Sequence, residues 1–193
     1  MENNFFSHDY FEKLKKVINE LDFASIDNVV KLFREAWLSD KQVIILGNGG
    51  SSMTALHITT DLNKSPFLAT GKRFRGRSLV DNIGLVMAYG NDISFDEIFS
   101  QQLMNIMDKG DLVVAISGSG NSPNVVKAVE YANKNGAITV ALTGFSGGVV
   151  KEIAQHNVWV NVQDMQIAED IHMIIGHIIM QNFCKKTNEF ESK

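Results

Sequence analysis

The stretch DLVVAISGSGNSPNVV, residues 111–126, runs from an apolar strand through a glycine–serine loop into a helix. Residues 112–116 are apolar throughout and rich in β-branched side chains, which is typical of a parallel strand covered on both faces. Pro123 suits the first turn of a helix, and Ser122 suits the N-cap before it. Inward-turned backbone N–H groups, serine hydroxyls and a helix N-terminus together favour a bound phosphate. No lysine follows in the spacing of a triphosphate loop, so no nucleotide cofactor is expected.

A second loop of the same kind follows an earlier apolar strand, in VIILGNGGSS at residues 43–52. Placing Leu46 on Ile116 superposes the two loops at a constant offset of 70 residues. Either loop alone is equally well explained as a tight turn. Two polar loops at the carboxyl ends of strands favour one shared ligand crevice.

Composition bounds the class of protein. The chain has 193 residues, of which 45% are apolar and 21% charged, and this predicts one ordered α/β domain with a sizeable core. The net charge is −4 without a basic run, so nucleic acid is not expected as a partner. The single cysteine, Cys184, excludes an internal disulfide. The polar start MENNFFSHDYFEKLKK and the lack of an apolar run near ~18 residues predict a cytoplasmic protein without a membrane span.

Strands alternate with helices along the chain, which predicts a parallel sheet with right-handed crossovers and helices on both faces. The expected strands are residues 42–46, 78–80, 112–116, 138–142 and 158–162. The expected helices are residues 9–21, 26–38, 52–63, a short one ending at 88, then 95–107, 123–133, 149–155 and 165–183. A turn is expected at residues 90–92.

The two helices before the first strand are unusually aromatic. They contain Phe11, Phe33 and Trp37, and Phe5 and Phe6 precede them. These helices are either an ordinary cap on the core or a helix-bundle interface between subunits, and the sequence leaves both interpretations open.

A basic cluster lies in the segment 65–76 and just after it, which is expected to be irregular. Lys72, Arg73, Arg75 and Arg77 stand close together there. A solvated surface loop is the preferred interpretation, and an anion-binding lid is the alternative.

GNGGSS, followed by His57 and Asp61 on the next helix, resembles the SIS (sugar isomerase) fold, and ISGSGNSPNV resembles its sugar-phosphate loop. With AEDIHMIIGH on the late helix, the chain is similar to the phosphoheptose isomerase family, which interconverts sedoheptulose 7-phosphate and D-glycero-D-manno-heptose 7-phosphate. The resemblance spans roughly residues 46–180. It implies one structural domain with a flavodoxin-like three-layer α/β sandwich, in which residues 1–40 serve oligomerisation and residues 41–193 bind the sugar phosphate.

The resemblance also implies binding roles for residues of the loops. The positions that match phosphate-binding residues of the family are Ser51, Ser117, Ser119 and Ser122. Those that match substrate contacts are Asn48, Gly49, Gly50, Asn91 and Asp92, together with Gly118 and Glu169, where the family usually has threonine and glutamine. The family is usually a homotetramer with sites at subunit interfaces, so a homotetramer is implied here.

Catalytic and metal-binding roles follow from the same resemblance. Asp61 stands where the family has a proton-moving glutamate, and His177 matches its second acid–base residue. Some members bind zinc at the positions of His57, Asp61, Glu169 and His177, which implies a Zn²⁺ site with one ion per subunit. His172 is five residues from His177 and on a different helix face, so we interpret it as structural.

Residue chemistry is compatible with this reading. Aldose–ketose isomerisation needs a base at the carbon atoms and an acid or metal at the oxygens. Asp61 and His177 fill these roles if their helices converge at the carboxyl edge of the sheet. Purely structural roles are the alternatives: His57 would be a packed helix residue, and Glu169 would be a first-turn charge that stabilises the helix dipole.

The sequence therefore predicts a sugar-phosphate isomerase acting on sedoheptulose 7-phosphate and feeding heptose synthesis for surface polysaccharides such as lipopolysaccharide. An isomerase of another ketose phosphate is the closest alternative. A SIS-type regulator that binds a sugar phosphate without turnover is an alternative of another class.

Overall fold

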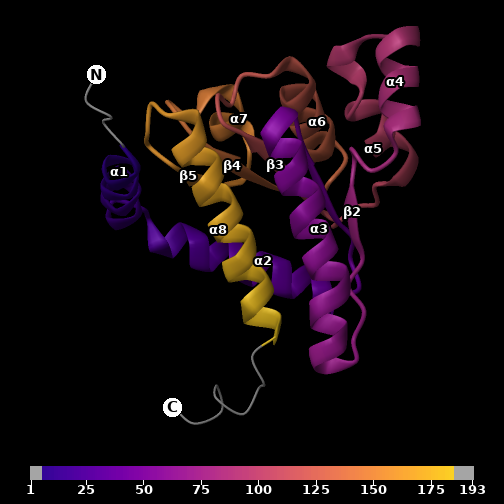
Figure 1. Cartoon of the computed structure of the whole chain (residues 1–193). Helices are drawn as coiled ribbons and strands as arrows, with labels where there is room; N and C mark the ends of the chain where they lie inside the picture. Colours follow the sequence, from indigo (N-terminus) through magenta and orange to yellow (C-terminus); the bar gives the residue numbers. More distant parts are fainter. Residues whose placement is uncertain (1–5, 185–193) are drawn as a thin grey trace.

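The computed structural model describes residues 6–184, which contain a five-stranded parallel sheet in the order β2-β1-β3-β4-β5 (Figure 1). The strands are β1 (Val43–Gly47), β2 (Gly76–Ser78), β3 (Leu112–Ser117), β4 (Ile138–Thr143) and β5 (His156–Trp159). β1 and β3 are hydrogen-bonded neighbours, paired from Val43 opposite Leu112 to Gly47 opposite Ile116. The predicted α/β class with a parallel sheet is confirmed, and the two polar loops leave adjacent strand ends.

Helices cover both faces of the sheet. They are α1 (Ser7–Asn19), α2 (Phe23–Leu38), α3 (Gly49–Thr70), α4 (Ile83–Asp92), the 3-10 turn η1 (Phe95–Glu97), α5 (Ser100–Ile106), α6 (Pro123–Lys134), α7 (Gly148–Ile153) and α8 (Met165–Cys184). Alternate strand residues point to opposite faces, so Ile45 packs with α2, α3 and α8, whereas Ile44 packs with α5, α6 and α7. Within residues 6–184, no helix is long and apolar enough to cross a membrane.

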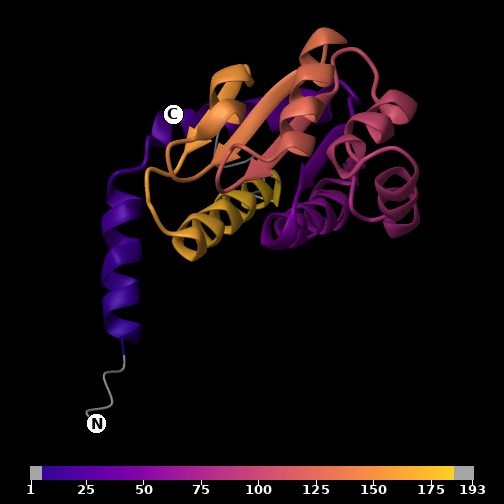
Figure 2. The same ribbon diagram turned by 90° about the horizontal axis from the view of Figure 1, so that it is seen from above.

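The two N-terminal helices differ in how they pack. α2 belongs to the core layer, because Phe33 is buried and the Trp37 ring packs edge-on against Phe183 at 5.4 Å between centroids. α1 projects beside the sheet (Figure 2), and Val17 is its one buried residue. Two of the aromatic residues that suggested a subunit interface, Phe33 and Trp37, therefore pack within this chain. Phe5 lies outside the described residues.

The helix after the first loop is longer than predicted. We expected residues 52–63 followed by irregular chain, but α3 begins at Gly49 and continues to Thr70. Pro66 lies inside α3 and is buried, so packing outweighs the backbone hydrogen bond that proline removes. Gly71, at φ 79°, then ends the helix in the left-handed conformation.

Several other element boundaries also differ from the prediction. The expected turn at residues 90–92 lies within the last turn of α4. The single helix expected over 95–107 is divided into η1 and α5. β2 and β5 begin two residues earlier than expected, because their ends are set by pairing with β1 and β4 rather than by the apolar run alone.

The basic cluster lies at the amino-terminal edge of the sheet, opposite the polar loops. It contacts Asp40 and Gln42, which directly precede β1. The contacts are Lys72 Nζ to Asp40 Oδ1 (2.9 Å), Arg75 Nη1 to the Asp40 carbonyl oxygen (2.7 Å) and Arg77 Nε to Gln42 Oε1 (2.8 Å). This placement favours a surface loop over an anion-binding lid.

α3 and α8 run parallel and in close contact on one face of the sheet (Figure 1). A Cβ atom on Gly176 would collide with Ile58, and one on Gly50 would collide with the Glu169 carboxylate. The absence of these side chains therefore lets the two backbones approach. The α3–α8 seam, defined here as this line of contact from Gly50 and Glu169 to His57 and His177, carries most of the predicted catalytic residues.

His172 faces the core from α8, as its predicted structural role requires. It is fully buried, and neither ring nitrogen has a hydrogen-bond partner among residues 6–184. Burial lowers the pKa of His172 to about 4, because it disfavours the charged imidazolium. The nearby backbone of Thr143 favours the charged form and offsets only part of this shift. The imidazole is therefore neutral in the folded protein at neutral pH.

This buried imidazole should make stability depend on pH. Unfolded His172 takes up a proton near its ordinary pKa of 6.5, whereas folded His172 takes it up only near pH 4. We expect the free energy of unfolding to be highest above pH 6.5 and to fall as the pH drops toward 4, by up to about 3 kcal/mol from this residue. Urea unfolding at a series of pH values measures the slope of the unfolding free energy against pH.

His172→Leu removes the titrating group, so its slope in this window should be shallower than that of the wild type. His8→Ala is the matched control, because His8 is exposed on α1 and its loss should leave the slope unchanged. Equal slopes in the wild type and His172→Leu would contradict the assignment.

Candidate active site

The first loop joins β1 to α3 at the carboxyl edge of the sheet. Gly47 ends β1, and a Cβ atom there would lie 2.8 Å from the Ile116 carbonyl oxygen, so glycine permits the close pairing with β3. Asn48 is the N-cap residue of α3, but its side chain makes no capping hydrogen bond. Gly49 and Gly50 form the first turn, and Ser51 is buried behind them.

The second loop joins β3 to α6 beside the first. Gly120 has φ 67°, and a Cβ atom there would strike the Gly147 carbonyl group, so only glycine fits this turn. The Gly120 N–H donates to Ser117 Oγ at 3.1 Å, which fixes the loop internally. Ser122 is at the predicted N-cap position of α6, but its hydroxyl makes no capping bond and is free to contact a ligand.

One cavity of about 260 Å³ lies between the two loops and the start of α8. Most of the predicted binding residues line it together. They are Asn48, Gly49, Gly50, Ser51, Ser117, Gly118, Ser119, Ser122 and Glu169, joined by Ile116 and Met165. Asn91 and Asp92 do not line it; they are exposed at the end of α4, where Asn91 Nδ2 donates to Asp92 Oδ1 at 2.7 Å.

α8 closes one side of this cavity. Its first turn brings Met165 against Gly118, and its second brings the Glu169 carboxylate over Gly50. The serine hydroxyls and the first turn of α6 supply donors for an anion, whereas Glu169 supplies an acceptor for hydroxyl groups. The cavity therefore suits a ligand that has a phosphate at one end and hydroxyl groups along its length.

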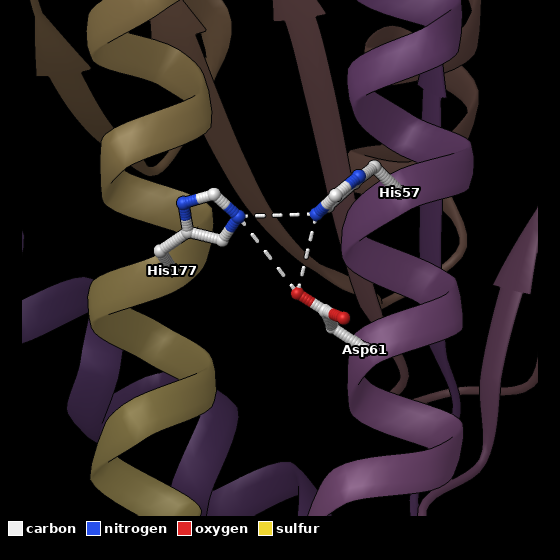
Figure 3. Close-up of side chains that lie close together, drawn as sticks. All are labelled: His57, Asp61 and His177. Carbon is white, nitrogen blue, oxygen red and sulfur yellow. Dashed lines mark hydrogen bonds and ion pairs between the residues drawn. The ribbon is translucent and has the colours of Figure 1, made fainter.

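A cluster of two histidines and one carboxylate lies further along the α3–α8 seam (Figure 3). His57 Nε2 is 3.0 Å from His177 Nε2 and 3.4 Å from Asp61 Oδ2, and His177 Nε2 is 4.0 Å from the same oxygen. The histidines are about half exposed, and Asp61 is less exposed. The predicted convergence of Asp61 and His177 thus occurs, although they meet along the helices rather than at the loops.

Glu169 is not part of this cluster. It precedes His177 by eight residues, so the two backbone positions are about 12 Å apart along α8. Its carboxylate lies over Gly50, and it would have to leave that contact to join the other three residues. The four-residue set expected from the sequence is therefore a set of three in this structure.

The three residues fit a zinc ion. Ligand atoms 2.0–2.1 Å from a tetrahedral zinc ion lie about 3.3 Å from one another. The three ligand atoms all lie within 4.8 Å of one another. Two of their separations, 3.0 Å between the histidine nitrogens and 3.4 Å from His57 to Asp61, are close to the distance expected around zinc. Two imidazoles and a carboxylate also form a common donor set for a zinc site that keeps one position open for substrate.

Comparison with known proteins shows the family of the chain. The SIS domain family matches residues 8–144. A probable phosphoheptose isomerase of Thermoplasma volcanium is 33% identical over 171 residues, covering 89% of this chain and 87% of that protein. The chain belongs to the phosphoheptose isomerase family of SIS-domain proteins. The phosphoheptose isomerase of Geobacter sp. (strain M21) is 36% identical over 155 residues, which is 80% of each chain.

Solved structures of the family share the fold. The phosphoheptose isomerase from Neisseria gonorrhoeae superposes with a TM-score of 0.84 at 25% identity, covering 91% of this chain and 95% of that one. Membership of the phosphoheptose isomerase family confirms the resemblance inferred from GNGGSS, SGSGNS and the late helix.

The sequence did not single out Asn124, on the first turn of α6. Its side chain is 1% exposed and forms two hydrogen bonds with Asn48. The sequence offered no distinct signal for it, because asparagine is common at a helix N-terminus and its partner lies 76 residues away.

Proposed function

We propose that this sugar-phosphate isomerase converts sedoheptulose 7-phosphate to D-glycero-D-manno-heptose 7-phosphate. The observation that carries the proposal is the arrangement along the α3–α8 seam. The serine-rich loops, which would bind an anion, lie at one end. The cluster of the proposed base, acid and metal ligands lies about 10–12 Å further along the two helices. A sugar phosphate whose reacting carbons are at the opposite end from its phosphate matches this separation.

The proposed chemistry moves one proton between neighbouring carbons. The Asp61 carboxylate takes a proton from C1 of the ketose, and the C–H electrons form the C1–C2 double bond of an enediol. His177 gives a proton to the former carbonyl oxygen at C2. Return of the proton from Asp61 to C2, with loss of the O1 proton to His177, completes the aldose.

Zinc is the alternative to the His177 proton: His57, His177 and one oxygen of Asp61 would hold the ion, and the second Asp61 oxygen would remain as the base, because a zinc-bound imidazole nitrogen carries no proton. A bound zinc ion would stabilise negative charge that develops on the substrate oxygens. The phosphate is proposed to bind Ser51, Ser117, Ser119 and Ser122, and the sugar hydroxyls to contact Asn48 and Glu169. Gly49, Gly50 and Gly118 would let the substrate approach the backbone, and Asn91 and Asp92 stay predictions of substrate contact.

The proposal includes a cytoplasmic homotetramer whose product supplies lipopolysaccharide heptose. Exposed apolar side chains support assembly, because Phe6 and Phe11 on the α1 side are 73% and 60% exposed. α4 has no buried residue at all, although Ile83 and Met87 make it apolar. Surfaces of this kind are typical of contacts between subunits.

Incubation of the purified protein with sedoheptulose 7-phosphate tests the function, with product detected by chromatography. We expect aldose 7-phosphate to form. Asp61→Asn keeps the size of the side chain but lacks a basic carboxylate, so turnover should fall by ~10²–10⁴ with substrate binding largely retained. Asp40→Asn is the control, because Asp40 pairs with Lys72 at the opposite edge of the sheet.

Wild-type turnover in Asp61→Asn would exclude Asp61 as the base. A wild-type protein that binds sedoheptulose 7-phosphate without isomerising it would favour the regulator. Turnover of a different ketose phosphate alone would keep the chemistry and change the substrate.

Zinc binding is tested on chelated protein by calorimetry and thermal unfolding. We expect one Zn²⁺ per chain to bind and raise the melting temperature, because the ion binds the folded cluster. His177→Ala should remove this binding, whereas His156→Ala should keep it, since His156 contacts Asn28 at β5. Unaltered zinc affinity in His177→Ala would exclude the cluster as the site.

Light scattering at micromolar concentration tests the assembly. The expected mass is about four times the chain mass of 21.4 kDa. Phe11→Ser should lower the mass by weakening an apolar contact, whereas Leu68→Ser, an exposed apolar site at the far end of α3, should not. A wild-type monomer would refute the tetramer.

A further inference from the structure

Asn48 and Asn124 form a reciprocal amide pair across the end of the sheet. Asn48 Nδ2 donates to Asn124 Oδ1 at 2.8 Å, and Asn124 Nδ2 donates to Asn48 Oδ1 at 3.0 Å. Each side chain thus gives one N–H and accepts one hydrogen bond. Because both bonds must align together, the pair fixes the rotation of both amide planes.

The pair joins two elements that lie on opposite faces of the sheet. Asn48 is the N-cap residue of α3, which packs on the same face as α8, and Asn124 is in the first turn of α6, on the other face. Asn48 forgoes the usual N-cap bond to its own helix to make this contact. The two cavity loops are therefore joined by a side-chain pair in addition to the backbone pairing of β1 and β3.

The two partners differ in what they leave free. Asn124 is 1% exposed and does not line the cavity, so the rest of its amide is sealed. Asn48 lines the cavity and keeps a second N–H and a second oxygen lone pair for a ligand. The serine loop takes no part in this pair: Ser117 Oγ accepts from the Gly120 N–H, and Ser119 Oγ accepts from the Asn121 N–H.

We propose that Asn124 is a positioning residue, which holds the Asn48 amide in the orientation that binds the hydroxyl groups of the sugar. This inference rests on the proposed function, because it assigns the Asn48 end of the cavity to the sugar and the serine end to the phosphate. Asn124 itself touches no substrate.

A double-mutant cycle tests the proposal. Wild type, Asn48→Ala, Asn124→Ala and the double variant are titrated by calorimetry with sedoheptulose 7-phosphate and, separately, with inorganic phosphate. We expect each single variant to weaken sugar-phosphate binding about five- to tenfold, which is the effect of about one hydrogen bond. The double variant should bind the sugar phosphate as tightly as either single variant, because Asn48 contributes to binding only when Asn124 orients its amide.

Inorganic phosphate separates positioning from general damage. Its affinity should change less than about twofold in Asn124→Ala, because the serine hydroxyls and the α6 backbone remain. Ser119→Ala should instead weaken both ligands. Asn133→Ala is the matched structural control: Asn133 is also on α6 and hydrogen-bonded, to Ile153 and Thr139, but lies at the far end of the helix. It should lower stability and leave both affinities unchanged.

Asn124→Asp supplies a pH-dependent rescue. A protonated carboxyl group can donate to Asn48 Oδ1 and accept from Nδ2, whereas a carboxylate would repel Oδ1. Relative to wild type at the same pH, sugar-phosphate affinity should be near normal at about pH 5 and reduced by about tenfold at about pH 8, since burial favours the protonated form. A purely structural role of Asn124 would move stability without this change in affinity ratio.

Additive losses in the cycle, a parallel loss of phosphate affinity in Asn124→Ala, or a pH-independent Asn124→Asp would each overturn the proposal. A wild-type protein that binds sedoheptulose 7-phosphate but does not isomerise it overturns the proposed function, while the cycle still decides the role of Asn124. A wild-type protein that does not bind this sugar phosphate overturns both.

Discussion

The parallel hydrogen bonds between β1 and β3 are the constraint on which the site depends. β1 continues outward to β2, and the chain then returns to place β3 on the other side of β1. Helices from these two strands consequently leave toward opposite faces, and their N-termini diverge around the gap between the strand ends. This is the switch point at which open parallel sheets bind ligands, and both polar loops lie there.

Close helix packing brings a second group of polar side chains near this gap, outside the lining of the cavity. Gly50 and Gly176 remove the two side chains that would separate α3 from α8. The parallel helices then present His57, Asp61 and His177 on the same seam that begins at the cavity. Two imidazoles, two carboxylates and a set of serine hydroxyls are thus brought together by three helices and two loops that the sheet positions.

Sequence patterns predicted the elements whose signal is local. The apolar runs of β1, β3 and β4 and the glycine–serine loops were placed within a residue or two, because burial on both faces and turn chemistry leave direct marks in the sequence. Pro66 and the segment 90–92 carry equally strong local signals for a break, yet α3 and α4 continue through them. At Pro66 tertiary burial outweighs the local preference, and no pattern near the residue reports that burial.

Contacts within one helix were more predictable than contacts between helices. An i, i+4 pair such as His57 and Asp61 must share a helix face, so its proximity follows from helical geometry. Glu169 was expected at the same ion because the family resemblance implies a ligand at its position. Its contact with Gly50 depends on how α8 lies against α3, which the sequence of α8 alone does not specify.

Asn124 is the converse case, a contact that exists in the structure but was not predicted from the sequence. In sequence it is one polar residue in a helix N-terminus, where asparagine is common and uninformative. Its partner is set by the register of β1 on β3: with Gly47 opposite Ile116, the next residue of the first loop stands beside the start of the second. The strand register that aligns the loops therefore also aligns the two amides. A change that shifts this register would disturb the amide pair and the cavity together, so the proposed sugar recognition would depend directly on strand pairing.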